Sequence, residues 1–250
     1  MNRTVLITGA SGSMGSAAVE SLSAEGWSVI MACRNLGKGS SVRDSVLERN
    51  PGADIALMHL DLESFDSVRR LASDLEGRRI DVLFNNAGTI SRSWGLTADG
   101  LEHTWQVNCK GPSLLMELLA PNLGKVVSMV SLTCSLVSTG QDYNGDSREE
   151  FSQLGTYARA KLGLLLSTLD FGRRTGIPVS LADPGVVNSN MISMGRWFDP
   201  LADILFRPFC SSPEKGVAPA LRAIRSDEAG LYYVGRKARP IPKKFTEAHI

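Results

Sequence analysis

Short runs of apolar residues, many of them β-branched, recur along the chain and alternate with segments long enough to form helices. The runs cover residues 4–8, 28–33, 55–61, 81–88, 125–131, 178–185 and 231–235. Near-continuous hydrophobicity is typical of strands buried on both faces, and alternation with helices indicates a parallel sheet covered on both sides. The pattern therefore predicts an α/β fold with one doubly wound parallel sheet of about seven strands. We expect it to form a single domain over residues 1–250.

Composition and charge exclude several classes of function. The chain of 250 residues carries 27 basic and 26 acidic residues, a net charge of +1, which gives no reason to expect nucleic acid or an anionic membrane as partner. No run approaches the roughly 18 apolar residues of a membrane span. The first apolar run begins too early to leave room for a signal peptide. We therefore expect a cytoplasmic protein whose function depends on a site for a small molecule.

The cysteines and histidines give no metal-binding pattern. Cys33, Cys109, Cys134 and Cys210 are far apart and form no C-x-x-C pair, and the three histidines are scattered as well. Reduced thiols are the simplest interpretation. We expect no metal site.

A glycine-rich segment follows the first predicted strand. Gly9, Gly12 and Gly15 are spaced by three residues in "TGASGSMG", and a helix-forming segment comes after them. Glycines there let backbone N–H groups approach a pyrophosphate at the start of a helix, where the helix dipole favours negative charge. Walker A and nucleophile-elbow motifs do not fit, because the Gly-Lys pair is absent and Ser13 stands where the elbow needs glycine. The segment predicts a nucleotide site.

The end of the second strand indicates which nucleotide binds. A fold specific for NAD places a carboxylate there to hold the ribose 2′-hydroxyl. In "ACRNLGK" the corresponding positions hold Arg34 and, four residues later, Lys38. Cations suit a 2′-phosphate, so we expect NADP(H); the alternative is that Arg34 is an ordinary surface residue.

The segment "LGTYARAKLGLLL" places Tyr157 four residues before Lys161. Side chains at this spacing lie on the same face of a helix. A lysine near a tyrosine favours the phenolate and brings its pKa of about 10 toward the range useful for acid–base catalysis. The same spacing also arises by chance in amphipathic helices, with the tyrosine at the edge of the core and the lysine in solvent.

Taken together and in this order, "TGASGSMG", "NNAG", Ser131, "YARAK" and "DPGVV" resemble the short-chain dehydrogenase/reductase family over nearly the full chain. The charged "ACRN" and the long segment before Tyr157 look most like its retinol dehydrogenase, carbonyl reductase and protochlorophyllide reductase branches. The resemblance implies a Rossmann fold and oxidoreductase activity.

The resemblance also implies roles for individual residues. Tyr157 is the expected proton donor or acceptor, Lys161 lowers its pKa and holds the nicotinamide ribose, Ser131 orients the carbonyl oxygen, and Asn108 holds a water linked to the lysine. The expected cofactor contacts are Gly9, Ser11, Gly12, Ser13, Met14, Gly15, Arg34, Lys38, Asp61, Leu62, Asn85, Ala87, Gly88, Tyr157, Lys161, Pro184, Gly185 and Val187.

The chain departs from the family pattern at a few positions. Ser13 stands where glycine is usual, with Gly12 one place early, so we expect a displaced backbone cradle in which Gly9 and Gly15 remain. Ala160 replaces a common serine before the lysine, a side chain that carries no proton. Asp183 stands before the Pro-Gly pair in place of the frequent asparagine or histidine, and places a charge near the nicotinamide.

These features predict an NADPH-dependent oxidoreductase that transfers a hydride between nicotinamide and a carbonyl or alcohol. Large apolar residues at 190–212, where the family builds its substrate lid, favour a lipophilic substrate; they could instead cap the core or face a partner. The alternative function is a catalytically silent NADP-binding sensor or interaction protein on the same fold. A stripe of Leu162, Leu166 and Leu169 makes a homodimer possible, unless the polar excursion at 138–153 covers it.

Overall fold

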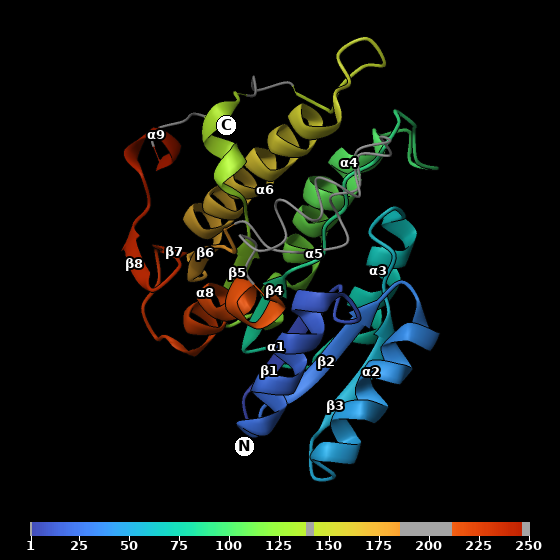
Figure 1. Cartoon of the computed structure of the whole chain (residues 1–250), viewed down its shortest axis with the longest axis vertical. Helices are drawn as coiled ribbons and strands as arrows, with labels where there is room; N and C mark the ends of the chain where they lie inside the picture. The colour runs from blue at the N-terminus through green and yellow to red at the C-terminus, as the bar shows by residue number, and fades with distance from the viewer. Residues whose placement is uncertain (1, 139–142, 186–211, 247–250) are drawn as a thin grey trace.

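The computed structural model describes residues 2–138, 143–185 and 212–246 and contains one eight-stranded sheet (Figure 1). The strand order is β3-β2-β1-β4-β5-β6-β7-β8. The strands are β1 (Thr4–Thr8), β2 (Ser28–Cys33), β3 (Ile55–His59), β4 (Val82–Asn85), β5 (Val126–Met129), β6 (Val179–Asp183), β7 (Leu231–Val234) and β8 (Lys237–Pro240). The first seven pair in parallel, each within one of the seven predicted runs. This confirms the doubly wound α/β fold.

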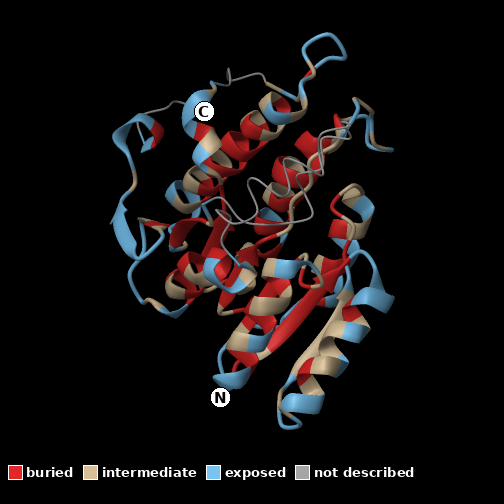
Figure 2. Cartoon of the chain, viewed as in Figure 1, coloured by how far each residue is buried: buried red, intermediate tan, exposed pale blue. Residues whose placement is uncertain are grey.

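The eighth strand was not predicted. β8 pairs antiparallel with β7 at the edge of the sheet, and all four of its residues are exposed. Because neither face of "KARP" is buried, its sequence carries no apolar run from which a strand could be recognised. In Figure 2 this strand is pale blue, whereas the central strands are red.

Helices cover both faces of the sheet (Figure 1). One layer consists of α1 (Ser13–Ala24), α2 (Leu36–Arg49) and α8 (Pro213–Arg225), and the other of α3 (Phe65–Asp74), α5 (Gly111–Leu119) and α6 (Gln153–Thr175). Successive side chains of β1 point to opposite faces of the sheet. Val5 and Ile7 pack in the core beneath α1 and α8, and Leu6 packs in the core beneath α3 and α5. Burial on both faces explains why the strands are apolar along their length.

Shorter elements connect these layers. They are α4 (His103–Trp105), a π-helical turn at Gln106–Lys110, 3₁₀ turns at Ala120–Asn122 and Leu132–Leu136, and α9 (Lys243–Thr246). α6 ends at Gly176, whose φ of 73° is the left-handed conformation that glycine adopts most easily and whose N–H donates to the Gly172 carbonyl.

The stripe on α6 that motivated a homodimer packs within the chain. Leu162 is buried, and Leu166 and Leu169 are partly buried, in a cluster that includes Phe245 and Ile241 from the C-terminal segment. These leucines therefore already have apolar neighbours in the same chain. The excursion is described from residue 143 onward and forms a loop before α6.

The connections predict a ligand site at the carboxyl ends of the strands, beside β1 and β4. The chain runs outward from β1 to β2 and β3, then returns to pair β4 with the other side of β1. In open parallel sheets, ligands bind outside the carboxyl ends of the strands at such a reversal.

Within the described ranges, no helix combines the length and apolar character needed to cross a membrane.

Candidate active site

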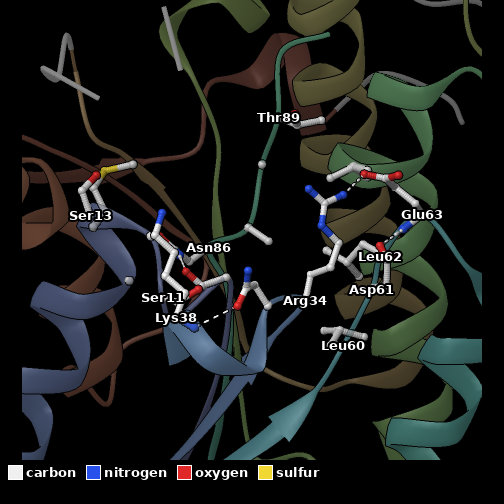
Figure 3. Close-up of a pocket in the computed structure, with 18 residues that line it drawn as sticks. Ser11, Ser13, Arg34, Lys38, Leu60, Asp61, Leu62, Glu63, Asn86 and Thr89 are labelled. Carbon is white, nitrogen blue, oxygen red and sulfur yellow. Dashed lines mark hydrogen bonds and ion pairs between the residues drawn. The ribbon is translucent and has the colours of Figure 1, made fainter. Parts of the chain in front are cut away.

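A cavity of about 650 Å³ lies at the carboxyl ends of the first four strands (Figure 3). Its walls come from four segments, each of which directly follows one of these strands, together with one residue of the π-helical turn. The lining residues are Gly9, Ser11, Gly12, Ser13, Met14, Gly15, Arg34, Asn35, Lys38, Leu60, Asp61, Leu62, Glu63, Asn86, Ala87, Gly88, Thr89 and Val107. The segments far apart in sequence thus meet where the topology predicts a ligand site.

Two glycines in the first of these segments have no room for a side chain. Gly9 has a φ of 64°, and a Cβ there would lie 2.9 Å from the Cα of Ala87. A Cβ on Gly15 would lie 2.3 Å from the Gly9 carbonyl oxygen, far inside van der Waals contact. Both glycines are therefore needed for the tight passage from β1 into α1.

The start of α1 faces this cavity with free donors. Gly12 is the N-cap and supplies no side-chain hydrogen bond. The first N–H groups of a helix have no acceptor within the helix, and the dipole there favours an anion. Although glycine stands at position 12 and serine at position 13, the start of α1 can therefore still offer N–H groups to an anion. Its first residues, Ser13, Met14 and Gly15, line the cavity.

The ends of β1 and β4 are joined by one hydroxyl. Thr8 Oγ1 accepts hydrogen bonds from the backbone N–H groups of Asn86 and Ala87, both at 3.0 Å. The Asn86 side chain donates back to the Thr8 carbonyl at 2.9 Å. Two of these three bonds are buried and the third is partly buried, so they fix the separation of the two cavity walls.

Most predicted cofactor contacts line the cavity, and a few do not. Asn85 is buried and its amide nitrogen lies 3.4 Å from Ser128 Oγ, behind the wall that Asn86 to Gly88 form. Pro184 and Gly185 follow β6 and are not among the lining residues. Val187 and residues 190–211 of the predicted lid lie outside the described residues. Five further lining residues carry no motif of their own and could not be recognised from the sequence: Asn35, Leu60, Glu63, Thr89 and Val107.

The Gly88 end of the cavity adjoins the predicted catalytic groups. A Cβ on Gly88 would lie 2.8 Å from Asn108 Oδ1 and 3.3 Å from Lys161 Nζ. Lys161 is buried, and its ammonium donates to the Met129 carbonyl at 3.0 Å. Tyr157, one turn earlier on α6, places its ring centroid 6.0 Å from that ammonium. The structure thus brings Asn108 and Lys161 against Gly88, and Tyr157 close to Lys161, although none of the three is among the residues that line the cavity.

The pKa of Tyr157 differs from the expectation drawn from its spacing to Lys161. Burial raises the pKa of the Tyr157 phenol above its ordinary value, and Cys134 and Asp183 raise it further. Burial also lowers the pKa of Lys161 to about 8. The expected lowering of the tyrosine pKa is therefore not seen in the chain alone, because desolvation dominates and the ammonium is engaged by Met129.

Asn108 lies in the π-helical turn Gln106–Lys110. Its amide nitrogen donates to the carbonyls of Thr89 and Thr104, each at 2.8 Å, and its Oδ1 accepts the Thr89 N–H at 3.1 Å. These bonds join the helix to the strand end at Gly88. π turns leave the regular helical ladder locally open and recur at functional sites. The water expected at Asn108 stays a prediction.

Ser131 comes two residues after β5 and caps the 3₁₀ turn Leu132–Leu136. Its Oγ accepts a hydrogen bond from the Thr133 hydroxyl at 2.9 Å. Met129, two residues before it, bonds to Lys161, and Cys134, three residues after it, packs against Leu162 and Leu165 of α6. Ser131 is therefore held between two contacts with the helix that carries Tyr157.

Comparison with known proteins identifies this arrangement. The family profile described as short chain dehydrogenase matches residues 3–196. The chain belongs to the short-chain dehydrogenase family. Among curated proteins, it is 30% identical to the WW domain-containing oxidoreductase of Gallus gallus over 92% of this chain and 61% of that protein. It is 27% identical to retinol dehydrogenase 13 of Homo sapiens, over 96% of this chain and 79% of that protein.

Solved structures of other proteins share the fold. A structure of an uncharacterized protein from Mycobacterium paratuberculosis has a TM-score of 0.75 and 30% identity, covering 96% of this chain and 85% of that one. The short-chain dehydrogenase from Sphingobium yanoikuyae in complex with NADPH has a TM-score of 0.68 and 19% identity, covering 92% and 87%. The chain spans about three fifths of the length of the WW domain-containing oxidoreductase it matches.

Two of the buried carboxylates of this short-chain dehydrogenase are Asp183, which stands before the Pro-Gly pair, and Asp146, which belongs to no sequence motif. Asp183 ends β6, accepts the Gly185 N–H at 2.8 Å and the Tyr232 hydroxyl at 2.9 Å, and has its pKa raised by burial. Its carboxylate is thus tied to the loop that follows β6 and to β7, and it acts on the phenol of Tyr157 through its charge.

The second carboxylate, Asp146, joins the excursion to the start of α6. Arg159 donates to both of its oxygens, at 2.8 and 2.6 Å, and the hydroxyls of Thr156 and Tyr143 also donate to it. The Asp146 carbonyl accepts from Trp94 Nε1 at 2.9 Å. We call this group the Asp146 clamp. Among the described residues, no three His, Cys, Asp or Glu side chains gather in a way that could hold a metal ion.

Proposed function

We propose that the chain is an NADPH-dependent oxidoreductase that transfers a hydride between nicotinamide and the carbonyl or alcohol carbon of an apolar small molecule. The observation that supports this proposal is that Lys161 packs beside Gly88 of the cavity wall, with the Tyr157 ring 6.0 Å from its ammonium one helical turn earlier. The other end of that cavity offers a glycine cradle and a helix start.

The residues present fit a dinucleotide. The start of α1 beside Gly9 and Gly15 would hold the pyrophosphate, and Asp61 and Leu62 would contact the adenine. Lys161, beside Gly88, would hold the nicotinamide ribose. The bound cofactor supplies or accepts the hydride, and the protein positions it and handles the proton.

Tyr157 is the group that we assign to the proton. Reduction of a carbonyl builds negative charge on its oxygen, and a neutral phenol in reach can donate its proton as that charge develops. A tyrosine is neutral near neutral pH at its ordinary pKa of about 10, and burial raises the pKa of Tyr157 further, so the ligand-free phenol carries its proton. Ser131 would donate a second hydrogen bond to the same oxygen, and the Lys161 ammonium would stabilise the resulting phenolate.

Arg34 and Lys38 support NADP(H) over NAD(H). Both line the cavity after β2, where a 2′-phosphate would lie if the nucleotide binds as in other doubly wound folds. Arg34 can pair with a phosphate through two N–H groups, and Lys38 adds a point charge. The Sphingobium protein was solved in complex with NADPH, and its similarity to this chain shows the fold alone.

Exposed leucines beside the catalytic groups support an apolar substrate. Leu132 and Leu136 are 53% and 81% exposed on the turn that Ser131 caps. Leu154 is 53% exposed and lies three residues before Tyr157, on the same side of α6. Large apolar side chains at a ligand site favour apolar ligands. The human relative is named for retinol, which is such a molecule.

A substrate panel with both coenzymes tests the proposal. We expect loss of NADPH absorbance with aldehydes or ketones, at rates that increase with the apolar surface of the substrate, and slower consumption of NADH. The matched reaction in reverse uses the corresponding alcohols and NADP⁺. A chain that binds NADPH but consumes none over the whole panel, in either direction, would instead support the catalytically silent NADP-binding protein.

A further inference from the structure

The nucleotide end of the cavity carries balanced charge. Its lining includes two basic residues, Arg34 and Lys38, and two acidic ones, Asp61 and Glu63. Recognition of a phosphate normally calls for an excess of cations. The carboxylate of Glu63 therefore needs an explanation, because its negative charge lies where it would repel a bound phosphate.

Glu63 engages the very cation on which phosphate recognition depends. Its Oε1 forms an ion pair with Arg34 Nη1, which Figure 3 shows as a dashed contact across the cavity wall. The Arg34 side chain is 63% exposed and that of Glu63 only 24% exposed. The more exposed partner is the one free to turn, so Arg34 can exchange this carboxylate for a phosphate while Glu63 stays in place.

Further contacts hold Glu63 in place. Its backbone N–H donates to Asp61 Oδ1 at 3.0 Å, and its Oε2 lies 3.0 Å from His103 Nε2. Ser91 Oγ lies 3.1 Å from the other ring nitrogen of His103. If that hydroxyl donates to Nδ1, the ring proton is on Nε2 and points to Glu63. The carboxylate therefore keeps a hydrogen-bond partner when Arg34 turns away, and it stays in place beside the nucleotide.

Lys38 is in a different situation. In the ranges that the structure describes, no carboxylate lies within ion-pair distance of its ammonium. A phosphate can thus meet Lys38 without displacing anything, whereas it must compete with Glu63 for Arg34. The two cations differ in availability, although their sequence positions indicate the same role.

We propose that Glu63 is a specificity-determining residue, which weakens recognition of an adenosine 2′-phosphate by occupying Arg34 and by repelling the phosphate. This inference rests on the proposed nucleotide site. It implies that the chain distinguishes NADPH from NADH less sharply than Arg34 and Lys38 alone would allow. The ligand class concerned is an adenosine nucleotide with a phosphate on the 2′-oxygen.

Titration with adenosine 2′-monophosphate and adenosine 5′-monophosphate tests this without any turnover. Glu63→Gln keeps the size of the side chain and removes its charge. Since an exposed ion pair contributes up to about 1 kcal/mol, and relief of repulsion adds to it, we expect about three- to tenfold tighter binding of the 2′-nucleotide. Binding of the 5′-nucleotide should change less than about twofold. The experiment is isothermal calorimetry on the full chain.

Two further variants make the result specific. Asp66→Asn removes the same charge three residues later, where the side chain is 89% exposed and pairs with Arg69 outside the cavity; it should leave both nucleotides unaffected. In an Arg34→Ala background, Glu63→Gln should give a smaller gain for the 2′-nucleotide, because occupation of Arg34 no longer contributes. The difference between the two gains measures the coupling.

Several outcomes overturn the inference, and they are distinguishable. If Glu63→Gln leaves the 2′-nucleotide unchanged while Arg34→Ala weakens it, Glu63 has no role in specificity and the NADP site stands. If Glu63→Gln weakens both nucleotides equally, the residue is structural. If neither nucleotide binds to any variant, the proposed function fails together with the inference.

Discussion

Removal of the Asp146 carboxylate should destabilise the chain at the start of the helix that carries Tyr157. The Asp146 side chain is 2% exposed and the Arg159 side chain 23% exposed. Arg159 follows Tyr157 by two residues, and Thr156, which also donates to Asp146, precedes it. Asp146→Asn keeps the shape of the side chain but leaves the guanidinium without a charged partner in a largely dry position.

The magnitude follows from this geometry. Breaking a buried ion pair by removing one partner costs about 3 to 5 kcal/mol of folding free energy. Because Arg159 is partly accessible to solvent, we expect the lower end of this range, about 3 kcal/mol, for Asp146→Asn. For a chain of this length, each kcal/mol lowers the melting temperature by about 2 to 4 °C, so we expect a decrease of about 6 to 12 °C. Burial opposes ionisation of Asp146, but hydrogen bonds from Arg159, Thr156 and Tyr143 outweigh it and keep its pKa below the ordinary value.

That pKa direction fixes the pH dependence. A carboxylate with a depressed folded-state pKa contributes stability above its unfolded pKa of about 3.9, and this contribution is lost as the pH falls through the folded-state pKa. The difference in melting temperature between wild type and Asp146→Asn should therefore be full at neutral pH and shrink in strong acid.

Thermal unfolding followed by circular dichroism, at neutral and acid pH, provides the measurement. Glu117→Gln is the control, because Glu117 pairs with Arg174 between α5 and α6 with side chains 45% and 49% exposed. Such a pair contributes at most about 1 kcal/mol. A melting temperature of Asp146→Asn within about 2 °C of that control would refute the reasoning, since it would mean that the clamp adds no more than a surface pair.

Three more predictions concern the cavity. Arg34→Ala should raise the KM for NADPH about ten- to a hundredfold, from the loss of a charge-assisted contact of about 1.5 to 3 kcal/mol, with the KM for NADH nearly unchanged; steady-state kinetics that show equal weakening of both coenzymes would make Arg34 structural. Because burial lowers the pKa of Lys161 to about 8, its ammonium is lost as the pH rises through that value, so the KM for NADPH should rise above about pH 8. A KM that is flat up to about pH 9.5 would argue against this role. Gly15→Ala should abolish nucleotide binding in calorimetry, since its Cβ would lie 2.3 Å from the Gly9 carbonyl oxygen, and binding at wild-type affinity would contradict the cradle.

The sequence predicted those parts of the fold that depend on local pattern. Seven strands carry apolar runs, because the central ones are buried on both faces and β3 and β7 are mostly half-buried, and they could therefore be recognised, whereas exposed β8 could not. The glycine segment could be recognised because the bend needs residues without a side chain. Tyr157 and Lys161 could be paired because helical spacing places them on one face.

Contacts between distant segments could not be predicted in this way. Glu63 lies 29 residues after Arg34, and nothing in "DLESF" marks it as the partner of that arginine. Asp183 and Tyr232 are 49 residues apart, on β6 and β7. The sign of the Tyr157 pKa shift depends on burial, which the Y-x-x-x-K spacing does not reveal. Each of these properties comes from tertiary packing.

We assign proton transfer to Tyr157 and binding of the cofactor to the residues that line the cavity. Tyr157→Phe removes only the hydroxyl, so with the best substrate of the panel we expect a loss of turnover of at least about 10²-fold. Its affinity for NADPH, measured by fluorescence titration, should stay within about twofold of wild type. Lys161→Ala should instead reduce both turnover and NADPH affinity. Retention of more than about a tenth of wild-type turnover by Tyr157→Phe, with NADPH still bound, would contradict the account.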